Sequence, residues 1–177
     1  METGENFVII GAGQTAGRAA EALRAQGYEG SITIVGDEPY PPYERPPLSK
    51  QVLVGENEPS STYVHNLTYY GENRIDLRIG VRADSIDRAA KAISLSNGTI
   101  LPYTKLLLAT GSKLRRLQIP GSDLAGIFYL RGIDDSMGIR KKLTAGAKVV
   151  VVGGGYIGLE VAAAAQKKNC QVTVIEM

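Results

Sequence analysis

The sequence is poor in cysteine, with one residue, Cys170, and it contains no tryptophan. One cysteine excludes an internal disulfide framework and any redox centre built from a pair of thiols. We interpret Cys170 as a small buried apolar residue. The formal net charge of +2 is too small to indicate a nucleic-acid partner, which would require a basic face or stripe.

Long apolar runs are also absent. No run reaches the roughly 18 residues needed to span a bilayer, and the start METGENFVII lacks the basic residues and cleavage site of a signal peptide. We therefore predict a cytoplasmic protein with no membrane partner and no metal site. Hydrophobic residues at 44% and charged residues at 21% are typical of a globular domain with a real core.

Three short basic clusters stand out against this balanced charge. They are Lys113 with Arg115 and Arg116, then Arg140 to Lys142, and then Lys167 with Lys168. Each is either a solvated surface or a docking surface for an acidic partner.

An apolar strand followed by a glycine-rich turn occurs twice. Residues 7–10 predict a strand, residues 11–17 a turn, residues 18–26 a helix and residues 31–35 a second strand. The same order returns as a strand at 149–152, a helix at 156–168 and a strand from 171 onward. Both segments therefore predict a right-handed βαβ unit.

The segment between the two units changes character several times. Residues 36–50 hold five of the eight prolines and predict an extended, stiff loop that leads into a helix near 48–54. The short alternating runs DLRIG, AISLS and TILPY, with a tight turn at Asn97-Gly98, predict a small antiparallel meander.

After the meander, residues 106–109 predict a strand that returns to the parallel sheet, and a helix is expected to begin near Asp134 after the loop-rich stretch 112–132. A parallel sheet of two strands cannot bury both of its faces, so we expect the second unit to continue beyond Met177.

The glycines of both turns have the spacing of a dinucleotide-binding fingerprint. The first copy has Gly11, Gly13 and Ala16, followed by Gly17, and the second has Gly153, Gly155 and Gly158. The first glycine allows a tight turn, the second lets the backbone approach a pyrophosphate, and the third lets the helix pack on the strand. The alternative is a glycine turn that holds no ligand.

An acidic residue follows the second strand of each copy, where it would accept hydrogen bonds from a ribose. Asp37 and Glu38 follow SITIVG, and Glu176 follows QVTVI. A carboxylate repels a 2′-phosphate, so Glu176 favours NADH over NADPH.

Three stretches together extend this interpretation: GAGQTAGRAAEALRAQGYEGSITIVGDEPYPPYERPPLSK, LLLATGS and VVVVGGGYIGLEVAAAA. They resemble the FAD-dependent ferredoxin reductases that serve bacterial cytochrome P450 and ring-hydroxylating dioxygenase systems. The resemblance implies an α/β flavoprotein with two dinucleotide-binding domains: a Rossmann-like FAD domain with an antiparallel β-meander, and a Rossmann-like NAD domain. In a chain of about twice this length, residues 1–112 would be the first FAD segment, 113–147 a connection, and 148–177 the start of the NAD domain.

The resemblance also assigns roles to residues. For FAD it implies contacts from Gly11, Gly13, Thr15, Ala16, Asp37, Arg45, Lys50, Ala83, Ala109, Thr110, Gly111 and Arg131, with Lys50 near the reactive end of the flavin as the catalytic, tuning residue. For NADH it implies contacts from Gly153, Gly155, Tyr156, Ile157, Gly158, Glu160 and Glu176.

Several of these residues have a plainer interpretation. Arg45 and Lys50 also fit surface charges after a proline-rich loop, and Thr110-Gly111 a strand end. Glu160 fits an acid that complements a helix dipole, and Tyr156 fits a core tyrosine as well as a ring stacked on flavin or nicotinamide.

The implied reaction is hydride transfer from NADH to FAD, followed by single-electron transfer to a [2Fe–2S] ferredoxin. A rubredoxin reductase, an NADH oxidase-like flavoprotein and a relative of apoptosis-inducing factor are alternatives, although the loop at 36–50 lacks the cysteine of thiol-relay enzymes. A different class also stays open, namely a nucleotide-binding fragment without catalysis.

Overall fold

The computed structural model describes residues 4–176, which form two compact units. Unit 1 comprises Met1–Glu44 with Tyr63–Ser112, and unit 2 comprises Arg45–Thr62 with Lys113–Met177. No helix in the described part of the chain is long and apolar enough to cross a membrane.

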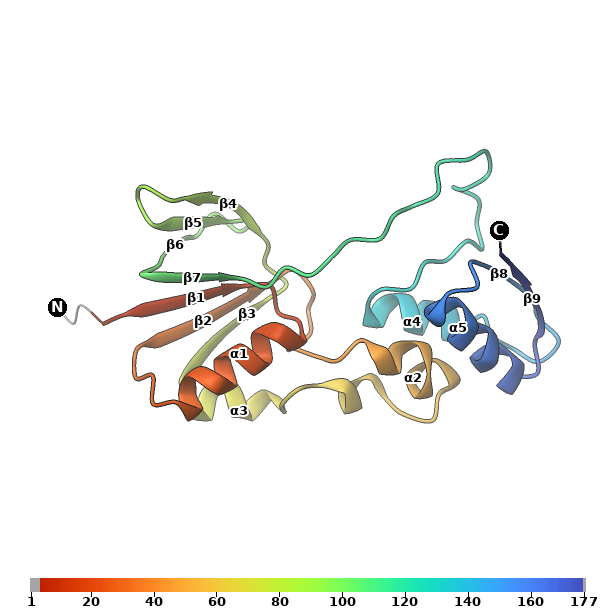
Figure 1. The fold of residues 1–177 in the computed structure, drawn as a ribbon, viewed down its shortest axis with the longest axis horizontal. Coiled ribbons are helices and arrows are strands. Elements are labelled where there is room, and N and C mark those ends of the chain that lie inside the picture. Colours follow the sequence, from red (N-terminus) through yellow and green to blue (C-terminus); the bar gives the residue numbers. More distant parts are fainter. Residues whose placement is uncertain (1–3, 177) are drawn as a thin grey trace. The chain divides into compact units, whose positions relative to one another are not determined.

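Unit 1 is built on a four-stranded parallel sheet in the order β3-β2-β1-β7 (Figure 1). Its strands are β1 (Asn6–Ile10), β2 (Ser31–Gly36), β3 (Ile75–Ile79) and β7 (Lys105–Leu108). Helix α1 (Gln14–Ala25) connects β1 to β2, and α3 (Leu67–Glu72) precedes β3. The first predicted βαβ unit and the returning strand are confirmed.

Alternation along β1 divides the core of unit 1 into two layers. Ile9 packs toward α1 and α3 together with Ala16, Ala20 and Tyr70. Val8 and Ile10 pack with Ile93, Leu95 and Leu101 of the meander. The meander lies on the face of the sheet opposite to α1 and α3 (Figure 1). Because Ala16 and Ala20 lie one turn apart and carry only a methyl group, α1 sits close to the sheet.

The meander contains β4 (Ala83–Asp87), β5 (Ala92–Leu95) and β6 (Ile100–Pro102), paired antiparallel. Gly98 has φ of +83° in the turn between β5 and β6, as the Asn-Gly pair predicted. The expectation that Ile75–Ile79 belongs to this meander was wrong, because β3 pairs parallel with β2. Strand β3 lies at the edge of the main sheet. Ile75 and Leu77 pack into the helix-covered core, whereas Asp76 between them is exposed.

Unit 2 contains the second βαβ unit. Strands β8 (Lys148–Val152) and β9 (Gln171–Ile175) pair parallel and are joined by α5 (Tyr156–Lys167), as predicted. The remaining elements are η1 (Pro46–Ser49), α2 (Gln51–Val54), η2 (Pro59–Thr62) and α4 (Ile133–Arg140). The proline segment is thus partly a 3₁₀ turn rather than fully extended, because Pro46 and Pro47 start a helical turn readily.

The core of unit 2 joins the turn region to the βαβ unit. Leu53 of α2 packs with Ile139 of α4 and with Ala164 and Ala165 of α5. Cys170 is buried in this cluster, where its Sγ lies 3.3 Å from the carbonyl oxygen of Thr144. The interpretation of Cys170 as a buried apolar residue is confirmed.

Candidate functional site

The two glycine turns have the same backbone geometry. Gly11 and Gly153 both have φ of +106°, a left-handed value that favours glycine. Each donates its N–H over 2.8 Å to a carbonyl oxygen near the end of the following parallel strand, Gly11 to Val35 and Gly153 to Ile175. The repeat seen in the sequence is therefore a repeat in three dimensions.

The second glycine of each turn is the N-cap residue of the following helix. A Cβ built on Gly13 or Gly155 would meet no atom within 4 Å. The first intrahelical bonds run from Gly17 to Gly13 and from Leu159 to Gly155, so the N–H groups of the first turn point out of each helix. Neither first turn contains an acidic residue, and the space beside each second glycine fits a diphosphate at a helix N-terminus.

The third position differs between the copies. A Cβ on Gly158 would lie 2.0 Å from the carbonyl oxygen of Gly153, so glycine is required there. Ala16 occupies the equivalent place in α1 and is fully buried, so its side chain belongs to the core.

The carboxyl edge of the unit 1 sheet gathers the other predicted FAD contacts of this unit. Asp37 directly follows β2 and is exposed, whereas the carboxylate of Glu38 accepts a hydrogen bond from the Tyr43 hydroxyl. Asp37 is therefore the acid open to a ribose. Ala109 follows β7, and a Cβ on Gly11 would approach its carbonyl oxygen to 2.1 Å.

The chain after β3 runs back to the same edge. Gly80 and Val81 donate to the carbonyl oxygens of Glu38 and Gly36 over 3.0 and 2.9 Å. These bonds fix the start of β4, and with it Ala83, beside the end of β2. Thr110 and Gly111, with φ of +67° at the glycine, complete this edge after β7.

Gly36 is a site residue that the sequence pattern did not reveal. A Cβ on Gly36 would lie 2.3 Å from the Cβ of Ala12, inside the glycine turn. The missing side chain lets the turn approach β2. Its only signal in the sequence is its place between the strand SITIV and Asp37.

Unit 2 holds the remaining predicted residues. Arg45 donates from Nη1 to the carbonyl oxygen of Arg131 over 2.7 Å, which joins two predicted FAD contacts. The Lys50 ammonium nitrogen lies 3.1 Å from Oε1 of Glu160, although the sequence assigned these residues to different cofactors. Both side chains therefore have partners, and Lys50 is also exposed, as a surface charge would be.

Glu160 has a second partner, Ser49, whose hydroxyl donates to the other carboxylate oxygen, Oε2. The hydrogen bond from Ser49, and then the charge of Lys50, hold the pKa of the Glu160 carboxyl below its usual value, although partial burial opposes the shift. Glu160 is therefore ionised at neutral pH. Nothing in the sequence pattern singled out Ser49.

The second cradle is open on its outer side. Tyr156 is 91% exposed at the start of α5, so it does not belong to the core formed by residues 4–176. Ile157 is 57% exposed next to it. The Glu176 carboxylate folds onto the turn and accepts a hydrogen bond from the N–H of Gly154, so the acid and the turn already meet.

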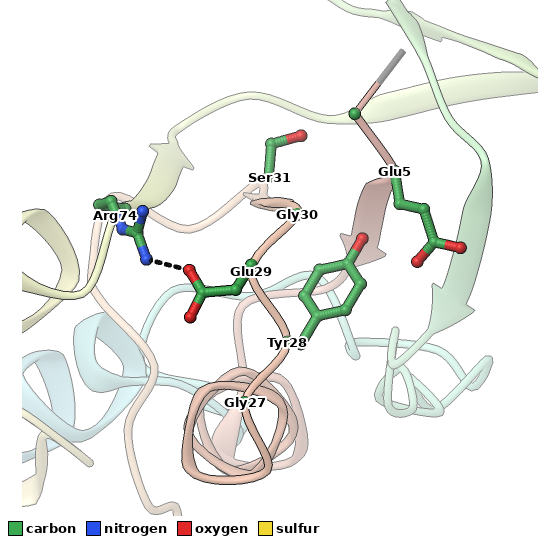
Figure 2. A pocket seen from close by; sticks show the side chains of 8 residues that line it. Glu5, Gly27, Tyr28, Glu29, Gly30, Ser31 and Arg74 are labelled. Atoms are coloured by element: carbon green, nitrogen blue, oxygen red, sulfur yellow. Dashed lines mark hydrogen bonds and ion pairs between the residues drawn. The ribbon is translucent and has the colours of Figure 1, made fainter. Parts of the chain in front are cut away.

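A separate hollow lies at the amino end of the unit 1 strands (Figure 2). It has a volume of about 860 Å³, is open to solvent and is lined by Glu5, Tyr28, Ser31 and Arg74 among others. Arg74 pairs with Glu29 at 2.7 Å across its rim (Figure 2). None of the predicted cofactor contacts lies there, because ligands of parallel α/β sheets bind at the carboxyl edge.

The repeated cradles, each with an acid after its second strand, define a class of protein that binds two dinucleotides. Residues 5–177 match the family model of the pyridine nucleotide-disulphide oxidoreductases, and the chain belongs to that family. FAD and NAD(H) are the cofactors of this family of oxidoreductases, and the residues of both cradles fit them.

Individual relatives narrow the comparison. The chain is 45% identical to the ferredoxin–NAD(+) reductase component of the anthranilate 1,2-dioxygenase system of Burkholderia cepacia, over 96% of this chain and 42% of the relative. It is 44% identical to the rubredoxin–NAD(+) reductase of Pseudomonas putida, over 96% of this chain and 44% of the relative. The chain thus spans less than half the length of the curated relatives that it matches.

A solved structure agrees with the fold. The ferredoxin reductase for the CYP199A2 system of Rhodopseudomonas palustris superposes with a TM-score of 0.91 at 38% identity, over 96% of this chain and 42% of that one. The predicted fold class is confirmed.

Proposed function

We propose that this chain is the first part of an NADH-dependent ferredoxin reductase. Bound FAD would supply the acceptor for a hydride from NADH and the donor of single electrons to a [2Fe–2S] ferredoxin. The observation that carries the proposal is the pair of glycine turns with equal φ, equal hydrogen bonds and open space at the second glycine. A cytoplasmic location belongs to the same proposal.

The first cradle binds FAD in this proposal. The free N–H groups at the start of α1 bind the pyrophosphate next to Gly13, and Asp37 accepts hydrogen bonds from the adenosine ribose. Ala83 contacts the adenine, and Ala109, Thr110 and Gly111 line the cofactor after β7. Arg45, Arg131 and Lys50 would contact the rest of the cofactor, where the Lys50 cation would favour the reduced flavin.

The second cradle binds NADH. The start of α5 binds the pyrophosphate beside Gly155, and Glu176 accepts hydrogen bonds from the adenosine ribose. The exposed ring of Tyr156 stacks on the nicotinamide or the flavin. Ile157 and Glu160 line the same site.

The electron acceptor is an acidic ferredoxin that docks on a positive surface. Two of the three basic clusters are partly neutralised, since Arg140 pairs with Glu58 at 3.4 Å and Lys167 with Glu56 at 2.6 Å. Exposed Arg115 is the better candidate for docking. A relative named as a rubredoxin reductase at 44% identity makes rubredoxin the second candidate acceptor.

A thiol relay is not part of the proposal. The single cysteine of this sequence lies buried before β9 and has no second cysteine in the chain to pair with. Electrons therefore do not leave through thiols of this chain.

The test is an assay of the full-length protein for bound flavin and for NADH-dependent reduction of a panel of ferredoxins and rubredoxins. We expect yellow protein that NADH bleaches and that reduces a [2Fe–2S] ferredoxin faster than a rubredoxin. The Gly13→Ala variant should lose FAD, whereas the matched Gly71→Ala variant should retain it, because Gly71 also has open space at its Cβ but lies in α3. Colourless protein without diaphorase activity would favour a nucleotide-binding module.

A further inference from the structure

The Lys50–Glu160 pair is held by a third residue. Ser49, the last residue of η1, is 4% exposed, and its hydroxyl donates to Oε2 of Glu160 while Lys50 approaches Oε1 at 3.1 Å. Two consecutive residues of one turn thus bind the two oxygens of one carboxylate on α5.

The turn itself is anchored independently of that carboxylate. Ser136 of α4 is fully buried and donates from Oγ to the carbonyl oxygen of Leu48 over 2.7 Å. The N–H of Lys50 donates to the carbonyl oxygen of Pro47 over 3.0 Å. The backbone on both sides of Ser49 is therefore fixed before its side chain reaches Glu160.

The Ser49 hydroxyl has one proton and two acceptors within reach. The carbonyl oxygen of Pro46 lies 3.3 Å away, whereas the bond to the Glu160 carboxylate is shorter. Hydrogen bonds to a charged acceptor are about twice as strong as neutral ones, so the proton goes to the carboxylate. Because Ser49 is buried, its hydrogen bond fixes the rotamer of the Glu160 side chain, which is partly exposed.

We propose that Ser49 is a positioning residue that locks the Glu160 carboxylate and thereby fixes the place of the Lys50 ammonium group. The role of that group at the flavin rests on the proposed function. The locking itself concerns only residues of unit 2.

The lock makes a measurable difference to Lys50. An amine that is held in an ion pair reacts slowly with an acylating reagent, and an amine released from it reacts faster. Loss of the Ser49 hydrogen bond, worth about 1 kcal/mol, corresponds to about a fivefold faster reaction of Lys50.

The experiment measures competitive acetylation of Lys50 in the full-length protein by mass spectrometry, with exposed Lys113 as the internal standard. We expect Ser49→Ala to raise the rate about fivefold. The control is Ser61→Ala, which removes an exposed hydroxyl from η2 that is bonded to the carbonyl oxygen of Glu58 at 2.7 Å. That control should leave the Lys50 rate unchanged.

A double variant separates locking from general loosening. In a Glu160→Gln background, Ser49→Ala should add little further increase, because the carboxylate that Ser49 holds is gone. A wild-type rate in Ser49→Ala, or equal increases in both backgrounds, would overturn the proposal.

The midpoint potential of bound FAD tests the proposed role of Lys50 at the flavin separately. If Lys50→Ala leaves the midpoint potential of bound FAD unchanged, the proposed role of Lys50 at the flavin fails, while the acetylation result still decides the role of Ser49. If Lys50→Ala shifts the potential, Ser49→Ala should shift it in the same direction by a smaller amount, and should add no shift when Lys50 is already alanine.

Discussion

Gly155 and Gly158 belong to one motif, but the structure gives them different physical reasons to be glycine. A Cβ on Gly158 would sit 2.0 Å from the Gly153 carbonyl oxygen, so α5 would have to move by about 1.4 Å to reach an ordinary contact of 3.4 Å. A Cβ on Gly155 would meet nothing within 4 Å. Gly158→Ala should therefore damage the fold, and Gly155→Ala should damage only ligand binding.

The magnitudes follow from these contacts. Overpacking against backbone costs about 1 to 3 kcal/mol, whereas alanine at an open helical glycine gains up to about 1 kcal/mol. Gly138 in α4 is such an open position and supplies the matched control. The free energy of local opening should thus differ by about 1 to 4 kcal/mol between Gly158→Ala and Gly138→Ala, which corresponds to roughly a 5- to 900-fold difference in amide exchange rate.

The assay is hydrogen exchange of the full-length protein, read separately for peptides of α5 and α4, with NADH titrations alongside. Gly158→Ala should accelerate exchange in α5. Gly155→Ala should leave that exchange within a few-fold of wild type and weaken NADH binding about 10- to 100-fold, through lost hydrogen bonds to the pyrophosphate. Unchanged exchange in Gly158→Ala, or unchanged NADH affinity in Gly155→Ala, would refute the reasoning.

Three further variants test other contacts. Glu176→Ser should reduce the preference for NADH over NADPH by about tenfold in kcat/KM, because a carboxylate next to a 2′-phosphate is removed; an unchanged ratio would place the discrimination elsewhere. Tyr70→Phe should stabilise unit 1 by about 1 kcal/mol in urea unfolding, because the Tyr70 hydroxyl is buried with no hydrogen-bond partner among the described residues. Burial raises the pKa of Tyr70 from 10.0 to about 12. The stability that its neutral form contributes is therefore complete below pH 10 and is lost as the pH rises through 12. The Tyr70→Phe variant should not show this alkaline loss. The lowered pKa of Glu160 contributes stability that is present above pH 4.5, its ordinary pKa, and that is lost as the pH falls through the lower folded pKa. Glu160→Gln should therefore make the midpoint of urea unfolding depend less on pH in the acid range.

The sequence predicted the parts of the fold that periodicity and glycine spacing determine. Both βαβ units, the turn at Gly98 and the strand at Lys105–Leu108 lie where expected. Those segments combine apolar residues at regular spacing with a turn residue that favours one backbone conformation, so local and tertiary preferences agree.

The strand Ile75–Ile79 shows where that logic fails. Its alternation of apolar and polar residues is the pattern of a half-buried antiparallel strand, and an edge strand of a parallel sheet produces the same pattern. Helix α3 was missed because six residues are too few to show a helical period, although Asn66 caps it by accepting from the N–H of Tyr69 at 2.9 Å.

The candidate site divides in a similar way. The glycines and acids of the cradles are set by local chain geometry, so spacing identified them. The contacts of Glu160 with Ser49 and Lys50 join residues more than one hundred positions apart, and only folding brings them together. Sequence reasoning therefore found the cradle residues and missed the residue that fixes the charged pair.

The two cradles also differ in what surrounds them. Neighbouring backbone and side chains close in on the first: Gly11 lies against Ala109, Gly36 against Ala12, and Gly17 so near Pro42 that a Cβ would approach it to 2.9 Å. The second turn is held by its own unit: the Glu176 carboxylate accepts a hydrogen bond from the N–H of Gly154, and a Cβ on Gly158 would lie 2.0 Å from the Gly153 carbonyl oxygen. Both turns are therefore preorganised by contacts that exist before a ligand arrives, which lowers the entropy that each loses on binding.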